Sequence, residues 1–405
     1  MKRMYEDVLH EHFANERQMA FVGGPRQVGK TTLISRLLGP GDTAFNWDRA
    51  SDRALMLKGG DVLADHCGLS NLSISGGKRL IAFDEIHKFR RWKNLLKGFF
   101  DTFEGRASVL VTGSARLNVY KRGGDSLMGR YFLYRMHPLS VGELVERPYA
   151  PVLLASPGEI SDDAFDALYR FGGFPEPFTR ASVRFYNRWA ALRTEQMFRE
   201  DLRDLTRVQE IDQLLALSHV LRAQAGALAN YSSLAADVAV SVDTIRRWLT
   251  ILESVYFSFR VRPWFRNVAK SLRKQPKVYP WDWSLVEDEG ARIECFVASH
   301  LLKAVHWWTD LGLGTFELFY IRDTLQREVD FLIAKDAKPW IMIEVKKSAK
   351  EPISSALRHF AAQLAVPHAF QAVMDMEPIL ENCFADSASG RVWRVPLRTL
   401  LSQLV

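Results

Sequence analysis

The pattern of apolar and polar positions divides the chain into two regions with strand-like runs, separated by a mainly helical region. In the first region, short and almost continuous apolar runs occur at 19–22, 80–83 and 108–112, with helix-like stretches between them. Runs of this length are typical of strands buried on both faces of a parallel sheet. We therefore expect residues 1–150 to form an α/β domain with a doubly wound parallel sheet.

The rest of the pattern predicts three further segments. Apolar positions at spacings of three and four indicate a helical lid or linker over 151–228. Two short helical patterns then predict a winged helix-turn-helix over 229–275, and mixed patterns predict a second α/β domain over 276–405. The strand-like runs of this last domain are 316–321, 328–334 and 340–346, after a helical stretch at 287–305.

Composition narrows the class of protein. The chain has 405 residues, of which 47% are apolar and 25% charged, as in an ordinary globular protein. Its formal charge of +7 and its pI near 9.2 are compatible with a polyanionic partner. No apolar run approaches the roughly 18 residues of a membrane helix, and the three cysteines form no C-x-x-C pair. We expect a cytoplasmic protein with no membrane partner and no zinc site.

The segment directly after the first apolar run carries the strongest chemical signal. Residues 24–31 read GPRQVGKT and fit G-x-x-x-x-G-K-[ST] at every fixed position, between a predicted strand and a predicted helix. Its glycines let backbone N–H groups face a polyphosphate, Lys30 reaches the β- and γ-phosphates, and Thr31 binds Mg²⁺. We therefore expect ATP and Mg²⁺ as cofactors. The expected nucleotide contacts are Gly24, Pro25, Arg26, Gln27, Val28, Gly29, Lys30, Thr31 and Thr32.

Two acids follow the second apolar run. Asp84 and Glu85 come at the end of a predicted strand, and the carboxyl ends of parallel strands are where α/β folds bind ligands. Asp84 is expected to hold Mg²⁺, mostly through water. Glu85 is expected to polarise the attacking water, so that its loss stops turnover but spares ATP binding.

The third apolar run ends in small polar residues. In the additional-strand architecture of P-loop proteins this strand lies between the two motif strands, so Thr112 or Ser114 can contact the γ-phosphate or the attacking water. The arginines that follow are Arg116, Arg122, Arg130 and Arg135. For each of these arginines, the alternative is that it is simply a solvent-exposed charge on a loop. Arg130 is the first choice for an arginine finger on a neighbouring subunit's nucleotide, which implies a homo-oligomer such as a hexameric ring.

Several stretches together resemble a family of prokaryotic AAA+-type ATPases. Its members carry an added C-terminal domain long labelled only as a domain of unknown function. The matching stretches are GPRQVGKTTL at 24–33, DEIHK at 84–88, TGS at 112–114, GR at 129–130, PLS at 138–140 and GGFPE at 172–176. The match continues through Asp282. Where the family often has Gly-Ser-Ser, this sequence has Gly113-Ser114-Ala115, which leaves Ser114 as the candidate γ-phosphate sensor.

A helix-turn-helix pattern lies in the middle of the chain. Residues 231–238 and 241–249 are its two helices, with Ser241 as the N-cap of the second. Arg246 and Arg247 are expected to project outward, where a recognition helix meets a major groove. The alternative is a packing module with no nucleic-acid partner.

A basic tract follows this pattern. Between residues 260 and 277 there are seven basic residues and no acid, with aromatic residues among them. DNA is the expected partner, and a solvated surface is the alternative. The tract's expected DNA contacts are Arg266, Lys270, Arg273 and Lys274.

The C-terminal domain holds a second constellation of charged residues. Asp330 on one predicted strand, followed by Glu344 and Lys346 on the next, resembles the signature of the PD-(D/E)XK restriction-endonuclease-like fold. Asp330 and Glu344 would bind Mg²⁺ or Mn²⁺, and Lys346 would orient the water or stabilise the developing charge. Glu294 matches the helix acid that completes the metal site in many such folds, and Gln363 is a weaker candidate. An inert DNA-binding platform is the alternative to a working nuclease.

Two functions from different classes stay open. The first is an ATP-hydrolysing AAA+-type protein that acts on DNA by remodelling, translocation or processing of branched DNA, with a C-terminal nuclease-like domain that binds or cuts DNA. The second is a regulatory ATPase switch whose C-terminal domain binds a partner protein. A small-molecule kinase is disfavoured, because it leaves the basic tract and the Glu-x-Lys site without a role.

Overall fold

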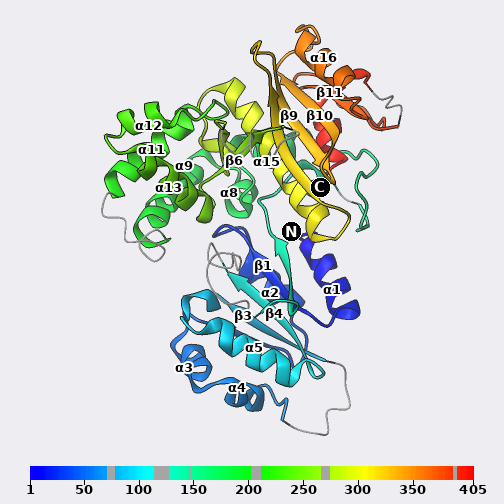
Figure 1. Ribbon diagram of the computed structural model, residues 1–405. Coiled ribbons are helices and arrows are strands. Elements are labelled where there is room, and N and C mark those ends of the chain that lie inside the picture. The colour runs from blue at the N-terminus through cyan, green and yellow to red at the C-terminus, as the bar shows by residue number, and fades with distance from the viewer. Residues whose placement is uncertain (71–77, 114–126, 146, 202–210, 266–273, 386–389) are drawn as a thin grey trace. The chain divides into compact units, whose positions relative to one another are not determined.

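The architecture is taken from a computed structural model (Figure 1). It describes residues 1–70, 78–113, 127–145, 147–201, 211–265, 274–385 and 390–405. The chain divides into two compact units, Met1–His137 and Pro138–Val405.

The first unit is built on a five-stranded sheet with the order β2-β3-β4-β1-β5. Its strands are β1 (Met19–Gly23), β2 (Thr43–Asn46), β3 (Arg79–Asp84), β4 (Ala107–Gly113) and β5 (Tyr131–Arg135). All neighbouring pairs are parallel. β4 lies between β1 and β3, as the additional-strand architecture predicts. The expected α/β fold of the P-loop ATPases is confirmed.

Helices cover both faces of this sheet. They are α1 (Tyr5–Asn15), α2 (Lys30–Leu37), α3 (Ala50–Lys58), α4 (Gly60–His66) and α5 (Trp92–Phe103), with a 3₁₀ turn η1 at Ile86–Lys88. On one face, Phe21, Phe83 and Val111 form a core with residues of α3, α4 and α5. The alternating residues Ala20 and Leu110 point to the other face and are also fully buried.

Most of the helices in the described ranges belong to the second unit. They are α6 (Val141–Leu144), α7 (Asp162–Phe171), α8 (Pro175–Arg180), α9 (Val183–Gln196), α11 (Ile211–Ala223), α12 (Tyr231–Asp237), α13 (Val242–Ser254), α15 (Glu289–Asp310), α16 (Ser355–Gln363) and α17 (Leu397–Ser402). A π-helical turn, η3 (Met197–Asp201), continues α9, and a 3₁₀ turn, η4 (Trp283–Leu285), precedes α15. Ser241 caps α13 by accepting a hydrogen bond from the Thr244 N–H, as its position before the apolar pattern predicts.

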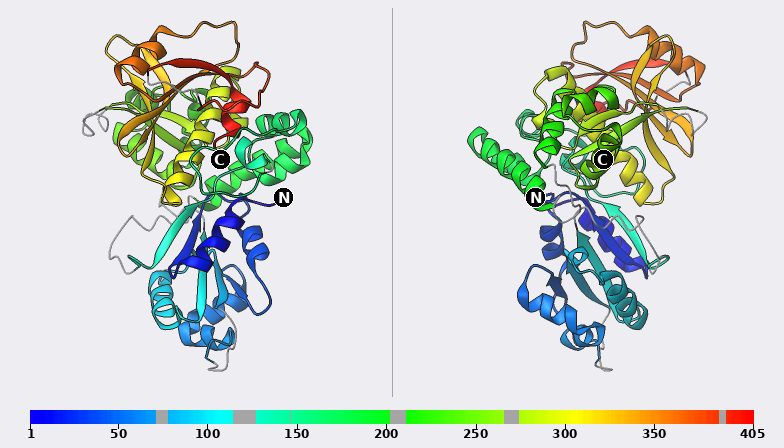
Figure 2. Two further views of the ribbon diagram at one scale, coloured as in Figure 1. Left: turned by 90° about the vertical axis from the view of Figure 1, so that its right-hand side faces the viewer. Right: turned by 60° about the vertical axis from the view of Figure 1, so that its left-hand side comes forward.

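A seven-stranded mixed sheet completes the second unit, in the order β12-β11-β10-β9-β8-β6-β7. Its strands are β6 (Ser258–Pro263), β7 (Lys277–Pro280), β8 (Phe316–Arg322), β9 (Glu328–Lys335), β10 (Lys338–Lys346), β11 (His368–Val373) and β12 (Val392–Pro396). Figure 2 shows β8–β12, in yellow to red, as one continuous sheet. α15 contacts β7 to β10, and α16 packs on β9 to β12.

The predicted boundary between 275 and 276 falls inside this sheet. β6 pairs with β7 as an antiparallel hairpin and with β8 in parallel, Arg262 opposite Phe319. The segment after the helix-turn-helix therefore shares its hydrogen bonds with the C-terminal strands. The sequence does not reveal this, because β6 and β8 are far apart along the chain.

None of the helices in the described ranges combines the length and the apolar character that crossing a membrane requires.

Candidate functional site

The loop between β1 and α2 has the shape of a phosphate cradle. Gln27 and Gly29 have left-handed backbones, with φ of 63° and 105°. A side chain at Gly24 would overlap the Met136 carbonyl, so this position requires glycine. Arg3 donates from Nη1 to the Val28 carbonyl at 2.6 Å and holds the loop from outside. A loop of this conformation that leads directly into a helix N-terminus is suited to present N–H groups to a phosphate.

Lys30 lies inside this loop. Its Nζ donates to the Gly24 carbonyl at 2.9 Å and to the Pro25 carbonyl at 2.6 Å, and the residue is only 6% exposed. Both acceptors are neutral. A triphosphate offers charged oxygens instead, and hydrogen bonds between two charged groups are roughly twice as strong as those between neutral groups. When a triphosphate binds, we therefore expect the Lys30 ammonium to leave the two carbonyls and to bind the phosphate oxygens.

Asp84 is the centre of the magnesium side of this site. It accepts hydrogen bonds from Thr31 Oγ1 at 2.8 Å, from Asn46 Nδ2 at 3.1 Å and from Thr112 Oγ1. Thr31 and Asp84 supply only oxygen atoms, the ligands that Mg²⁺ prefers, and their oxygens lie close enough to share one cation. These residues fit the predicted ion.

Two of the residues that bind Asp84, Thr112 and Asn46, differ from what the sequence predicted. Thr112, predicted to reach toward the γ-phosphate, uses its buried hydroxyl to hold Asp84. Asn46 was not predicted at all. It ends β2 and stands in register with Asp84 at the same sheet edge, so its position after a strand was the available signal.

Glu85 follows Asp84 in a strained conformation, with φ of 55°. Its side chain is 16% exposed, and Oε2 lies 3.6 Å from Lys88 Nζ and 3.7 Å from His87 Nε2. Among the described residues, this buried oxygen has no hydrogen-bond partner. Burial, aided by the charge of Asp84, raises the pKa of Glu85 above its ordinary value, against the opposing charges of Lys30, Lys88 and Arg26. A carboxylate with an unused acceptor beside the magnesium residue is suited to take a proton from water.

Arg130 lies at the opposite end of the sheet from this site. Tyr131, the next residue, pairs with Met19 at the start of β1, whereas the cradle follows the end of β1. Arg130 forms a two-pronged ion pair with Asp101, at 2.6 and 3.0 Å. It cannot serve its own nucleotide, and its use by a neighbouring copy stays a prediction. Ser114, Arg116 and Arg122 lie outside the described residues.

The predicted DNA residues are partly described. Arg246 and Arg247 are exposed on α13, and Arg246 pairs with Asp243 at 2.9 Å. Lys274 is exposed before β7. The remaining predicted contacts fall outside the described ranges: Arg266, Lys270 and Arg273.

Both ends of the basic tract are used within the chain. Arg260 donates from Nε to Glu253 Oε1 at 2.7 Å. Lys277 is only 4% exposed and lies among carboxylates. Neither residue was among the expected DNA contacts, and their acidic partners leave them unavailable to phosphate.

The C-terminal constellation has the predicted strand geometry. Val345 N–H donates to Asp330 Oδ2 at 2.9 Å, which fixes the β9 carboxylate beside β10. Lys346 Nζ lies 3.1 Å from Glu344 Oε1, and Ser354 at the start of α16 donates to Glu344 Oε2. The two strands therefore bring the Asp and Glu-x-Lys residues together.

Lys277 stands at the centre of the remaining acids. Its Nζ is 2.9 Å from Glu294 Oε1, 2.8 Å from Glu328 Oε1 and 3.8 Å from Asp330 Oδ1. Burial disfavours the ammonium, but these carboxylates outweigh burial and raise the pKa of Lys277. Burial and the charge of Glu294 raise the pKa of Asp330 to about 7, against the opposing effect of Lys277.

This arrangement does not fit the predicted Mg²⁺ or Mn²⁺ at Glu294, Asp330 and Glu344. In the part of the chain that the structure describes, no three His, Cys, Asp or Glu side chains are placed to hold a metal ion. The physical reason is Lys277. A divalent ion 4 Å from an ammonium is repelled by about 8 kcal/mol at an effective dielectric constant of 20.

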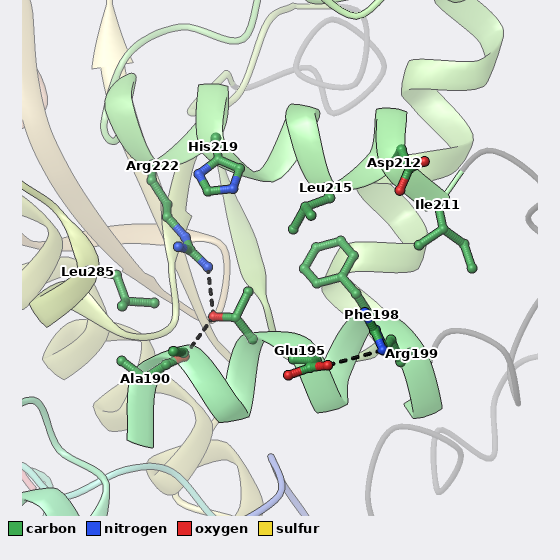
Figure 3. A pocket seen from close by; sticks show the side chains of 12 residues that line it. Ala190, Glu195, Phe198, Arg199, Ile211, Asp212, Leu215, His219, Arg222 and Leu285 are labelled. Atoms are coloured by element: carbon green, nitrogen blue, oxygen red, sulfur yellow. Dashed lines mark hydrogen bonds and ion pairs between the residues drawn. The ribbon is translucent and has the colours of Figure 1, made fainter. Parts of the chain in front are cut away.

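Two cavities lie in the second unit, and the weaker candidate Gln363 lines the first of them. One, of about 1290 Å³, lies between β8 and α16 and is lined by Trp264, Tyr320, Arg322 and Phe360, among others. The other, of about 430 Å³, lies between α9 and α11 (Figure 3). There the Arg222 guanidinium donates to Thr194 Oγ1 at 3.2 Å.

Three family models match successive parts of the chain. Residues 16–145 match an AAA domain, residues 162–288 match a domain of unknown function (DUF8612), and residues 289–381 match another (DUF4143). Most of the first unit thus matches an AAA domain, and part of the C-terminal region matches a DUF4143 domain.

Relatives cover most of the chain at low identity. An uncharacterised protein of Mycobacterium tuberculosis is 26% identical over 351 residues, which are 83% of this chain and 71% of that protein. An uncharacterised protein of Methanocaldococcus jannaschii is 22% identical over 404 residues, covering 88% of this chain and 83% of that protein.

Similar solved structures include a DNA polymerase III gamma subunit-related protein of Thermotoga maritima and PCH-2 of C. elegans. The first is 9% identical, covers 62% of this chain and 97% of that chain, and has a TM-score of 0.26. The second is 12% identical, covers 61% of this chain and 65% of that chain, and has a TM-score of 0.25. These scores are too low to carry a functional comparison.

Proposed function

We propose that the first unit hydrolyses ATP and that the second unit binds DNA, so that nucleotide turnover is coupled to an action on DNA. The observation that carries the ATPase part is the arrangement around Asp84. Thr31 lies at hydrogen-bond distance from it, and Glu85 follows it with an unused buried oxygen. This is the set of groups that in-line attack of water on a phosphate requires.

Each group has a defined task in this mechanism. Lys30 leaves the two carbonyls of the loop and binds the β- and γ-phosphates. Thr31 and Asp84 would hold Mg²⁺, which screens the phosphate charge when it is bound with ATP. Asn46 and Thr112 fix the Asp84 carboxylate, so that it does not have to reorganise. Glu85 accepts a proton from the attacking water as this water approaches the γ-phosphate.

The DNA part rests on exposed basic residues of the second unit. Arg246 and Arg247 lie on α13, the second helix of a helix-turn-helix arrangement, and Lys274 lies directly before β7. The β6–β7 hairpin follows α13 in the order expected of a winged helix. Contacts of this kind with phosphate make binding strongly dependent on salt.

A regulatory switch that binds a protein is the second candidate. The observation in its favour is that Arg260 and Lys277 are taken up by internal acids, which reduces the basic surface. Duplex DNA titrated at increasing salt separates the two functions. A steep fall of affinity with salt supports DNA, and no binding at low ionic strength favours the protein partner.

The ATPase part is tested by Lys30→Ala, with Lys58→Ala on the exposed end of α3 as the matched control. We expect Lys30→Ala to lose ATP binding in calorimetry and Lys58→Ala to bind like the wild type. Unchanged ATP affinity in folded Lys30→Ala would refute the assignment of the loop.

A further inference from the structure

Four carboxylates gather where β9, β10 and α15 meet. They are Glu294 on α15, Glu328 and Asp330 on β9, and Glu344 on β10. Glu344 is buried and the other three are partly buried, so the mutual repulsion of these acids has to be offset by a cation or by hydrogen-bond donors. The question is which cation does this.

Groups of the chain itself bind every one of these acids. Glu328 is paired with Lys277 at 2.8 Å and with Arg322 at 2.9 Å. Glu294 Oε1 forms an ion pair with Lys277 Nζ at 2.9 Å and accepts a hydrogen bond from the Tyr279 hydroxyl at 2.6 Å. Asp330 has the Val345 N–H on one oxygen.

Glu344, the last of the four, is bound on both oxygens. Lys346 contacts one oxygen and Ser354 the other. Lys346, which was predicted to serve the reaction, is thus engaged with an acid that was predicted to bind the metal.

The backbone holds Lys277 in this position. The residue stands opposite Val261 in the β6–β7 hairpin and forms an isolated bridge with Leu228, and its ammonium lies 5.8 Å from the centre of the Tyr320 ring. An ammonium has three protons to donate, and three acids surround it. It cannot withdraw without breaking the contacts that neutralise them.

We propose that Lys277 is a built-in cation that takes the place of a divalent metal, so that the second unit holds no metal at this cluster and does not cut phosphodiester bonds there. Mg²⁺ needs oxygens at about 2.0–2.1 Å that are free to coordinate. Here the oxygens of Glu294 and Glu328 are committed to an ammonium instead. The Lys277 ammonium supplies positive charge where a nuclease-like site would hold a metal ion, but it cannot coordinate and activate a water molecule as a metal does.

Manganese binding in the absence of nucleotide and DNA tests this inference, and the result does not depend on either part of the proposed function. The probe is Mn²⁺ itself, followed by electron paramagnetic resonance and calorimetry. We expect the wild type and Asp330→Asn to bind Mn²⁺ equally, because Asp330 holds no metal. Mn²⁺ binding by the wild type that disappears in Asp330→Asn would overturn the proposal.

A second experiment removes the Lys277 ammonium and asks whether a metal ion then binds in its place. Lys277→Met should gain one Mn²⁺ site that is lost again in Lys277→Met/Asp330→Asn. Its melting temperature should fall by roughly 10 °C and recover when Mn²⁺ is added. A folded Lys277→Met that gains no site would contradict the assignment. If that variant does not fold, the comparison of the wild type with Asp330→Asn still decides.

Discussion

Asp84 and Glu85 are adjacent acids with opposite environments. Asp84 accepts three side-chain hydrogen bonds, from Thr31, Asn46 and Thr112, and its geometry is set by them. Glu85 instead has a buried oxygen without a hydrogen-bond partner among the described residues, on a left-handed backbone. Environments that separate two acids in this way assign them different roles, one to hold a cation and one to take a proton.

Glu85→Gln is expected to bind ATP and to hydrolyse it at least about 100-fold more slowly, because the amide cannot accept the proton. Quenched-flow phosphate release and ATP calorimetry measure the two properties separately. Glu85→Asp is the control that keeps the charge and should retain part of the rate. Normal turnover in Glu85→Gln would remove Glu85 from its proposed role.

The raised pKa of Glu85 also predicts a pH dependence. Turnover needs the ionised carboxylate, so the rate should fall on acidification at a higher pH than the ordinary glutamate pKa of 4.5. At pH values between 4.5, the pKa of Glu85 in the unfolded chain, and its raised pKa in the folded chain, the folded state binds more protons than the unfolded state. This group therefore lowers stability as the pH rises through that window. A pH–rate profile whose acidic limb persists in the residual activity of Glu85→Gln would contradict this.

At the scale of elements, the longer apolar runs were predicted as strands, and the short strand β2 was not. β1 and β3 are continuous apolar runs followed directly by the phosphate loop and by Asp84, so local sequence identifies them. β2 is only four residues long with one buried position, and Asn46 was missed with it.

Lys277 shows a second limit of sequence reasoning. Along the chain it is one base of a basic tract. Its environment comes from Glu294 on α15 and from Glu328 and Asp330 on β9, which only the tertiary fold brings together. The Asp and Glu-x-Lys pattern was predictable because it lies on one hairpin, β9–β10. The cation that fills it was not, because it belongs to a distant strand.

The hairpin β6–β7 should depend on its bonds to α15. Tyr279→Phe removes the hydroxyl that donates to Glu294 at 2.6 Å and is expected to lower the free energy of unfolding by about 2 kcal/mol. Tyr169→Phe is the matched control, because the buried Tyr169 hydroxyl has no hydrogen-bond partner in the described ranges. Chemical denaturation measures both. Equal stability of the two variants would show that the Tyr279–Glu294 contact does not hold the hairpin.

α13 is the element predicted to meet DNA. Arg247→Ala should weaken binding to duplexes of any sequence and reduce the slope of log affinity against log salt by about 1. Arg188→Ala on the exposed side of α9 makes the same charge change elsewhere. Fluorescence anisotropy at several salt concentrations measures both variants. Identical slopes for the two would place the DNA surface elsewhere.

At the scale of the whole molecule, the position of Arg130 bears on assembly. It lies at the end of the sheet away from its own phosphate loop, so a role in hydrolysis requires a second copy. Arg130→Ala should then lower the rate on the order of 10³-fold. An equal mixture with Lys30→Ala should recover about a quarter of wild-type activity, since that share of sites has both an intact loop and an intact neighbour.

Two results would argue against this assembly. One is an Arg130→Ala variant with full activity, which would leave the residue as the surface partner of Asp101. The other is an inactive variant that mixing does not restore. Asp101→Ala is the control, because it frees Arg130 without removing it.

The rate of ATP hydrolysis with and without DNA tests most directly whether the proposed ATPase activity of the first unit is coupled to DNA binding by the second. The wild type is assayed with linear duplex, branched and single-stranded DNA in Mg²⁺, at low and at high salt, with Lys30→Ala as the blank. We predict that at least one form of DNA accelerates hydrolysis at low salt and that high salt abolishes the acceleration. A wild type that hydrolyses ATP at one rate, whatever DNA is present at low salt, would contradict the account.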